Sequence, residues 1–404
     1  MKKSTLLSLL VVSSVFADAK LDLLQKQLNK QQMQIYALET KNTNQSASFS
    51  QNAYLPAIAL ILNMSAVARD VNNTAYEDLS IPGFIDYNPT NKNSKAELPF
   101  NKSRGFNLNY AEVAMHSAVD PYFDAFAIFH LHPHEFEIEE AYVQTRSLPY
   151  ALRIKAGKFK SNFGRMNFKH QHSWHFDAQP IIYKALFGPD AISDAGIQLQ
   201  WIAPTDTYIM TGIEALQGTN ERSFGDKEIN NLYVSYLKSS IDIGEDLSIL
   251  GGISLAHGKN LTTHTTDVYG VDLTMREQLG AYSSLIWQSE YLQRNKKIDE
   301  TTNKQGGFYT ELIYRINRNY YCGVHYDAIT KNDIDLQRYS TNHINTDNLN
   351  RYLVKIDYKP FSMSRLRLSY SYDRTKVIAG ERKNINTVML SLNIAAGAHG
   401  AHNY

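Results

Sequence analysis

The sequence has almost no cysteine and no long apolar run beyond its first residues. Cys322 is the single cysteine in 404 residues, which excludes an intramolecular disulfide framework. After residue 17 there is no run of about 18 apolar residues, so no membrane-spanning helix is expected. The formal net charge is +1, from 41 basic and 40 acidic residues, and this balance argues against a nucleic-acid partner.

Composition leaves two β classes open. The mean hydropathy is −0.38, a value typical of a soluble protein. Outer-membrane barrels also reach such values, because only every other strand residue faces lipid. Aromatic residues make up 11% of the chain, with 26 tyrosines and 17 phenylalanines. Tyrosine suits β-strands in general as well as the aromatic girdles at the two membrane interfaces.

The C-terminal part of the chain alternates between two kinds of side chain. From about residue 350 onward, Tyr352, Val354 and Ile356 alternate with Lys355 and Asp357, and the pattern continues to the last strand. A period of two places each set on one face of a strand. In a soluble sandwich the polar face lies in water. In a membrane barrel the apolar face contacts lipid and the polar face lines the lumen.

The N-terminal part differs from the rest. Residues 1–17 have the form of a secretory signal peptide, with a basic start, a short apolar stretch and small residues before the cleavage site. Residues 18–40 carry apolar side chains at heptad spacing and predict a coiled-coil helix, most simply a trimer. A lone amphipathic helix on the barrel or membrane surface is the alternative. Residues 41–51 form a polar linker, and residues 52–404 contain strands and loops.

Alternation and turn signals predict about sixteen strands after the linker. Their approximate spans are 54–64, 106–118, 122–132, 137–147, 151–160, 194–203, 207–215, 230–241, 247–257, 267–274, 280–290, 307–316, 319–330, 351–359, 364–375 and 385–396. The expected fold class is therefore all-β. If the strands close into a barrel, about sixteen of them leave a lumen too wide for strand side chains to fill, and an aqueous channel is expected.

The links between the strands favour a transmembrane antiparallel barrel. Long and short links alternate along the chain, and the link at Pro133–Phe136 is the one short member of the long set. Long links are expected at 65–105, 161–193, 216–229, 258–266, 291–306, 331–350 and 376–384. Outer-membrane barrels have short periplasmic turns and long outer loops, whereas a soluble sandwich has no reason to sort its links by length.

The link at 161–193 is apolar and aromatic, unlike the other long links. Such a segment must bury its side chains, and the barrel interior is the natural place, where it would narrow the pore. The polar faces of the last strands would line the same pore. The basic candidates for this lining are Arg315, Lys355, Arg365 and Arg367. Acidic residues accompany them, so ion selectivity does not follow from the sequence.

Histidines gather on one side of the expected barrel. The candidates for metal binding are His130, His132, His134, His170, His172, His175 and the neighbouring Asp177. Histidines two residues apart on a strand share a face and can offer two nitrogens to one Zn²⁺ ion. Capture of zinc or another divalent metal at the pore mouth is one interpretation, and packing inside a plugged lumen is the other. No spacing matches a closed structural zinc motif.

A set of short segments resembles a family of Gram-negative outer-membrane proteins. These are porin-like barrels, often uncharacterised or labelled zinc-regulated TonB-dependent outer-membrane receptors. The resembling segments are Gly105–Leu108, Ala118–Pro121, Glu139–Val143, Lys155–Phe159, Phe163–Gly164, His170–His172, Phe176–Asp177, Gln179–Pro180, Trp201–Pro204 and the tail Ala398–Tyr404. The resemblance implies an outer-membrane barrel and a link to zinc. A TonB-dependent receptor needs a plug domain before a 22-stranded barrel, and this chain is too short for one.

These observations favour a porin-like channel for passive diffusion of small hydrophilic solutes or ions across a Gram-negative outer membrane. The expected partners are outer-membrane lipid, small solutes and further copies of the chain in a trimer. One alternative is an outer-membrane receptor or channel that binds zinc through the histidines. A second is a structural barrel or adhesin that displays the long polar loops. No nucleophile motif or phosphate-binding loop occurs, so no enzymatic activity is expected.

Overall fold

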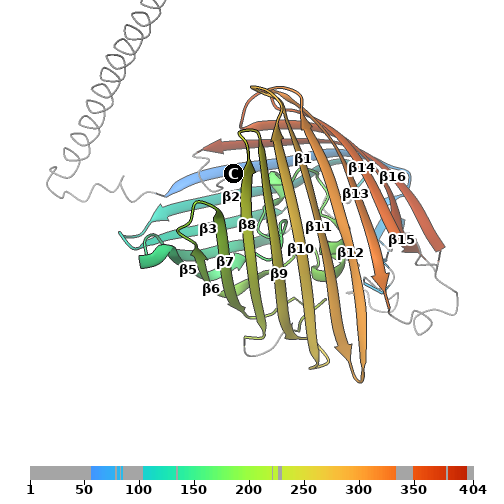
Figure 1. Ribbon diagram of the computed structural model, residues 1–404. Coiled ribbons are helices and arrows are strands. Elements are labelled where there is room, and N and C mark those ends of the chain that lie inside the picture. Colours follow the sequence, from blue (N-terminus) through green and yellow to red (C-terminus); the bar gives the residue numbers. More distant parts are fainter. Residues whose placement is uncertain are drawn as a thin grey trace, which may run out of the picture. The chain divides into compact units, whose positions relative to one another are not determined.

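The period-two pattern of the sequence produces a single closed β-sheet (Figure 1). The computed structural model describes residues 56–77, 80–81, 83–84, 103–132, 135–220, 222–225, 230–333, 349–378 and 381–397. Sixteen antiparallel strands pair in sequence order, and β1 pairs with β16 to close the barrel. The predicted all-β, sixteen-stranded barrel is confirmed. The signal peptide at 1–17, the helix at 18–40 and the linker at 41–51 lie outside the described residues.

Each predicted strand has a counterpart in the barrel. The strands are β1 (Ala57–Arg69), β2 (Gly105–Ala118), β3 (Phe123–His132), β4 (Glu135–Thr145), β5 (Leu152–Lys160), β6 (Ser193–Ile202), β7 (Tyr208–Leu216), β8 (Leu232–Ile243), β9 (Leu247–Lys259), β10 (Thr265–Gln278), β11 (Ser284–Ile298), β12 (Thr301–Arg315), β13 (Tyr320–Asn332), β14 (Leu349–Tyr358), β15 (Ser364–Ile378) and β16 (Glu381–Gly397). Two short α-helices, α2 (Asn73–Glu77) and α3 (Ile181–Phe187), lie between strands. Within the described ranges, no helix has both the length and the apolar character needed to cross a membrane.

The outer face of the barrel is apolar. On β14, Tyr352 is 47% exposed and Ile356 is 57% exposed, whereas the alternating Leu353, Lys355 and Asp357 are buried on the inner face. The same outward exposure recurs around the sheet, for example at isoleucines of β7 and β9. A closed ladder also pairs the backbone groups of every strand with both neighbours, which is what a lipid environment demands.

Two of the expected long links are strand instead. The link expected at 291–306 is a continuous hairpin, in which β11 and β12 stay paired up to Ile298 and Thr301. Asp299 in the turn has φ of 51°, a left-handed conformation that aspartate tolerates. The link expected at 376–384 is likewise shortened, because β15 runs to Ile378 and β16 begins at Glu381. Lysine, asparagine and threonine dominate these strand ends. Because such ends have no apolar face, they do not show the alternation from which strands are predicted.

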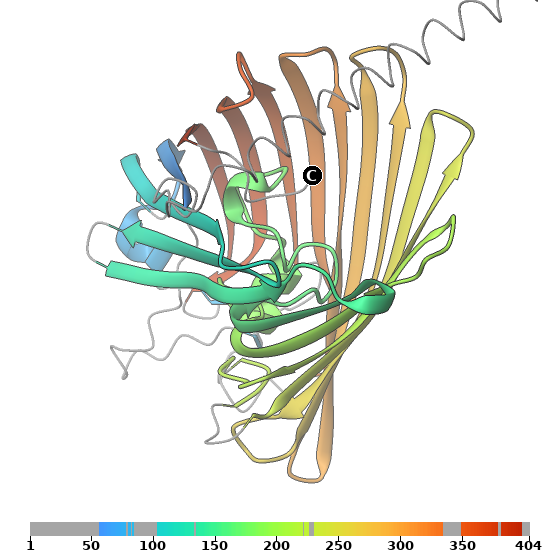
Figure 2. The same ribbon diagram turned by 90° about the vertical axis from the view of Figure 1, so that its left-hand side faces the viewer.

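The segment between β5 and β6 lies inside the barrel (Figure 2). Its helix α3 packs against β11, β12 and β13. Elsewhere in the segment, His170 contacts Glu139 of β4, and Asp177 contacts Arg367 of β15. Because β4, β12 and β15 lie on different sides of the closed sheet, only a segment in the lumen can reach all of them. We call residues 161–193 the inner segment.

The inner segment and part of the barrel wall form a hydrophobic core within the lumen. All residues of α3 are buried. Phe163 and Phe187 meet edge to face, with ring centroids 5.5 Å apart, and belong to one cluster with Val268 of β10 and Leu292 of β11. Gly164 starts this arrangement with φ of +59°, and a Cβ there would lie 2.0 Å from Glu290 Oε1. That side of the lumen is therefore filled with protein.

Candidate functional site

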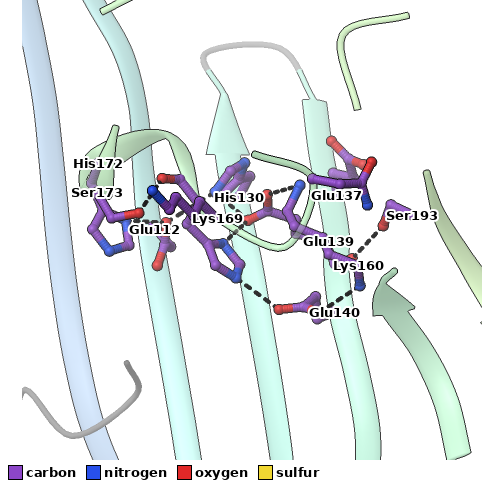
Figure 3. A network of polar contacts seen from close by, with 12 residues as sticks. Glu112, His130, Glu137, Glu139, Glu140, Lys160, Lys169, His172, Ser173 and Ser193 are labelled. Carbon is purple, nitrogen blue, oxygen red and sulfur yellow. Dashed lines mark hydrogen bonds and ion pairs between the residues drawn. The ribbon is translucent and has the colours of Figure 1, made fainter. Parts of the chain in front are cut away.

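Polar side chains of the inner segment meet polar side chains of the wall at several places, and three of these contain histidine or aspartate residues expected from the sequence. The first and largest meeting point we call the histidine–glutamate cluster. It comprises Glu112 of β2, His130 of β3, Glu139 and Glu140 of β4, Lys160 of β5, and His170 and His172 of the inner segment. Figure 3 shows how these strands and the inner segment bring the side chains together.

Short contacts connect the whole cluster. His130 Nε2 lies 2.7 Å from Glu139 Oε2 and 3.2 Å from Glu112 Oε2. His170 lies between two carboxylates, with Nδ1 3.0 Å from Glu139 Oε2 and Nε2 2.7 Å from Glu140 Oε2. On the other side, Nδ1 of the third histidine, at position 172, is 3.1 Å from Glu112 Oε2. Every carboxylate in the cluster thus contacts at least one imidazole.

A β-bulge explains why two consecutive glutamates both face inward. Adjacent strand residues normally point to opposite faces. The β3–β4 pairing shifts register between Ile128 and Phe129, and an extra residue on β4 turns both Glu139 and Glu140 toward the lumen, where both are buried. The bulge doubles the number of carboxylates that one strand supplies to the cluster.

Buried carboxylates need nearby positive charge. Lys160 Nζ lies 2.9 Å from Glu139 Oε1, and the Lys160 backbone N–H donates to Glu140 Oε1 at 2.7 Å. His170 belongs to the inner segment rather than to a strand. Burial alone would lower the pKa of His170, but Glu139 and Glu140 outweigh burial and raise this pKa well above its ordinary value. Protonated His170 and Lys160 place two positive charges among the three carboxylates.

The same residues also have the donor set of a divalent-metal site. Glu112, Glu139 and His170 each offer one ligand atom, and these atoms all lie within 4.8 Å of one another. Carboxylate oxygen and imidazole nitrogen are common ligands of Zn²⁺. All three residues are buried, and Oε1 of Glu112 is buried without a hydrogen-bond partner. A cation at this point would take the place of the shared protons.

The second meeting point holds His175. Its Nδ1 lies 2.5 Å from Oε1 of Glu311 on β12, and Oε2 of the same carboxylate is 3.2 Å from His325 Nδ1. His325 Nε2 in turn lies 2.9 Å from Asp327, which Arg351 holds at 2.6 Å. The expectation that His175 joins the other histidines was therefore wrong, because His175 contacts Glu311 of β12 instead.

The third meeting point holds Asp177, which the sequence also grouped with the histidines. Arg367 Nη1 lies 3.1 Å from Asp177 Oδ1, and Ser391 Oγ donates to Oδ2 at 2.9 Å. Arg367 Nε also donates to Asp357 at 2.7 Å, and Lys355 Nζ donates to the same carboxylate at 2.7 Å. Arg367 and Lys355, two expected pore-lining cations, are thus buried in ion pairs. Asp177 has a basic partner rather than a place among metal ligands.

The other two expected pore-lining cations, Arg315 and Arg365, are hydrogen-bonded to carbonyl groups rather than paired with carboxylates. Arg315 and Arg365 are half-buried on the inner face. Arg315 Nε donates to Asn317 O at 3.2 Å, and Arg365 Nη1 donates to Trp174 O at 3.3 Å. Both acceptors are neutral carbonyl groups, and no ion pair of either guanidinium is found among the described residues.

The structure therefore brings together His130, His170 and His172 from the expected metal set. The side chain of His132 and all of His134 lie outside the described residues. Glu112, Glu140 and Lys160 of the cluster were not predicted from the sequence. Glu112 could have been noticed, because it is the one acidic residue in the β2 sequence.

Comparison with known proteins adds relatives and fold neighbours. No known family model matches the chain. A protein of Aquifex aeolicus (strain VF5), described only as uncharacterised, is 36% identical over 391 residues, which span 89% of this chain and 82% of that protein.

Solved structures share the fold. The outer-membrane channel DcaP of Acinetobacter baumannii aligns with a TM-score of 0.56 at 11% identity, covering 86% of this chain and 99% of DcaP. The trimer form of the Vibrio cholerae outer-membrane protein OmpT aligns with a TM-score of 0.51 at 12% identity, covering 85% and 100%. These neighbours and the sixteen strands give no support to the TonB-dependent label, since such receptors have 22-stranded barrels.

Proposed function

Since this chain belongs to the family of the uncharacterised Aquifex aeolicus protein and has the fold of outer-membrane porins, we propose that it is an outer-membrane channel. It passes small hydrophilic solutes by diffusion through a lumen that the inner segment narrows. The observation that carries the proposal is the division of the barrel wall. Apolar side chains face outward on every side, whereas charged side chains of the wall and inner segment face the lumen.

The outer and inner faces of the barrel suit different surroundings. An apolar outer surface on a closed sheet is stable in lipid and unstable in water. A sixteen-stranded barrel without an inner segment would leave a wide aqueous pore. In this chain Phe163, Phe187 and the whole of α3 fill one side of that space. The remaining passage is bounded by polar side chains, as a path for hydrophilic solutes requires.

The direct test is the single-channel conductance of the purified protein in planar lipid bilayers. Replacing residues 166–187 with a short Gly-Ser linker removes most of the inner segment and leaves the wall unchanged. The expected result is a larger single-channel conductance, because the cross-section of the pore increases. A matched control deletes residues 336–345 from the link between β13 and β14, and its conductance should equal that of the full chain.

Two outcomes would count against this proposal. If the full chain inserts into bilayers and produces no conductance, the channel function is wrong. If the full chain conducts and the deletion leaves conductance unchanged, the inner segment does not limit the pore. Each variant is run on a gel both unheated and after boiling. A difference in migration between the two samples shows that the variant retains the folded barrel.

A second candidate function is binding of a divalent metal, and the histidine–glutamate cluster favours it. Glu112, Glu139 and His170 supply a carboxylate, a second carboxylate and an imidazole within reach of one ion. His130 and His172 stand beside them, with a nitrogen 2.7 Å from Glu139 and 3.1 Å from Glu112, respectively. Zn²⁺ is the ion that this mixed donor set suits best.

Isothermal titration with Zn²⁺ tests this candidate. A variant with His130, His170 and His172 changed to alanine should lose the strongest binding event. His257→Ala is the control, since this histidine is exposed and contacts Asp267 outside the cluster. His175→Ala should also bind like the full chain, because this residue contacts Glu311 instead. Equal binding by the triple variant would remove the cluster as a zinc site.

The channel is proposed to work as a homotrimer in the outer membrane. The heptad pattern of residues 18–40 supports self-association. OmpT of Vibrio cholerae, which shares the fold, is described in a trimer form. The apolar outer wall would contact lipid where it does not contact another copy.

A further inference from the structure

One end of the barrel has an excess of basic side chains on its inner wall. We call it the turn end, because it carries the short links that join each even-numbered strand to the next one, such as β2 to β3 and β14 to β15. All of these short links lie within the described residues. The described residues therefore include every turn that could supply a charged partner at this end.

The first group of cations surrounds the start of the inner segment. Lys238 Nζ of β8 donates to Gly164 O at 2.7 Å and lies 4.8 Å from the centre of the Phe168 ring. Arg165 Cζ lies 6.0 Å from the same ring. Lys169 Nζ donates to Gln288 Oε1 at 3.2 Å. Neutral carbonyl groups and an aromatic ring hold these three cations.

The second group of cations lies on the wall of β12 to β15. Arg315 Cζ and Lys359 Nζ lie 5.5 Å and 4.5 Å from the centre of one ring, that of Tyr321. Two cations therefore share a single aromatic ring. Arg365 is their neighbour and donates to Trp174 O of the inner segment. Arg315, Lys359 and Arg365 are all half-buried on the inner face, so water and solutes can reach them.

Carboxylates do not neutralise either group directly. Among the described residues, none of the six cations lies within 4.0 Å of a carboxylate oxygen, in contrast to Lys355 and Arg367. Asp272, Glu290 and Glu311 face the first group, and Asp177 and Asp357 face the second, but all five carboxylates are buried. Lys238 is buried as well, at 3% exposure. The half-buried side chains that a solute can meet in these two groups are the cations Arg165, Lys169, Arg315, Lys359 and Arg365, so the accessible charge is mainly positive.

Charges of one sign in a narrowed pore determine which ions pass. Low-dielectric walls concentrate the field of such charges, and groups within about 8 Å act together at physiological salt. Arg365 contacts Trp174 of the inner segment, the same segment that carries Arg165 and Lys169. We propose that the channel selects small anions, such as carboxylates and phosphates, and that Arg315, Lys359 and Arg365 determine this selectivity together with Arg165 and Lys169. This inference rests on the proposed channel function.

The reversal potential across a planar bilayer with a KCl gradient tests the inference, with chloride as the probe anion. The full chain should be more permeable to chloride than to potassium. Changing Arg315, Lys359 and Arg365 to glutamine should lower this permeability ratio by at least roughly twofold, because three charges leave the passage. Arg318→Gln is the control. Arg318 is exposed at the same end and contacts Tyr282, and the ratio should not change.

A second variant tests the charges of the inner segment separately from those of the barrel wall. Arg165→Gln with Lys169→Gln removes charge from the inner segment and should also lower the ratio. A conducting full chain that prefers potassium, or prefers neither ion, overturns the anion inference and leaves the channel proposal standing. Unchanged ratios in both multiple variants overturn the assignment of these residues. A barrel that conducts nothing overturns the channel proposal and this inference with it.

Discussion

Lys359 is one of the cations at the turn end whose charge changes near neutral pH. It follows β14 and lies outside the strands. Burial and the neighbouring Arg365, Arg367 and Arg315 together lower the pKa of Lys359 to about 8, although Asp357 acts in the opposite direction. The amine is charged below this pH and neutral above it. Anion selectivity should therefore be greatest in mild acid and fall as pH rises through about 8.

Reversal potentials of the full chain between roughly pH 6 and pH 10 measure this change. Lys359→Arg is the informative variant, because a guanidinium stays charged over the whole range. The variant should keep its chloride preference where the full chain loses it. If both proteins show the same fall in selectivity, another group is responsible and Lys359 has no part in the pH dependence.

At the residue scale, the sequence predicted half of the site. Histidines two positions apart indicated a shared face, and His130, His170 and His172 do converge. His175 and Asp177 lie in the same segment but bind other strands, since the chain turns between them and the cluster. Spacing along the chain does not predict which strands a residue of the inner segment contacts. The Arg367–Asp177 pair, for example, joins residues 190 positions apart.

At the scale of the element, alternation predicted the strands well wherever lipid imposes it. Each of the sixteen expected spans overlaps an observed strand, because one apolar face is required across the membrane. The errors lie beyond that region. The hairpin of β11 and β12 continues through a polar stretch that was expected to be a loop, where hydrogen bonding alone maintains the pairing. The bulge on β4 was missed because one extra residue leaves no signal in an already polar stretch.

The inner segment was recognisable for a different reason. Its aromatic and aliphatic side chains would be unstable in water, and the sequence offered no other surface to cover them. In the structure they form the largest buried apolar cluster with inward-facing residues such as Val234 and Leu292. Polar contacts, among them those of His170, His175 and Asp177, fix the segment to the wall around this core. A segment held in this way is a fixed constriction rather than a loose loop.

For the whole molecule, the remaining question is how many copies work together. Residues 18–40 lie outside the described part of the chain, and their sequence has a heptad pattern. Leu21, Leu24, Leu28, Ile35 and Leu38 occupy the apolar heptad positions. Such a seam buries its side chains only against other helices, and an isolated helix of this length is marginal in water. Three copies would bury the apolar heptad positions against one another, and OmpT, which shares the fold, is described in a trimer form.

Changing Leu24, Leu28 and Ile35 to asparagine should convert the proposed trimer into monomers, because polar residues destabilise the seam. Light scattering of the detergent-solubilised protein gives the mass of each form. Lys26→Ala is the matched control, since residue 26 falls on the outer side of the heptad and its change should leave the trimer intact. A full chain that is monomeric contradicts the trimer. A trimer that survives the asparagine substitutions would instead place the interface on the barrel wall, where the exposed apolar side chains are the alternative contact surface.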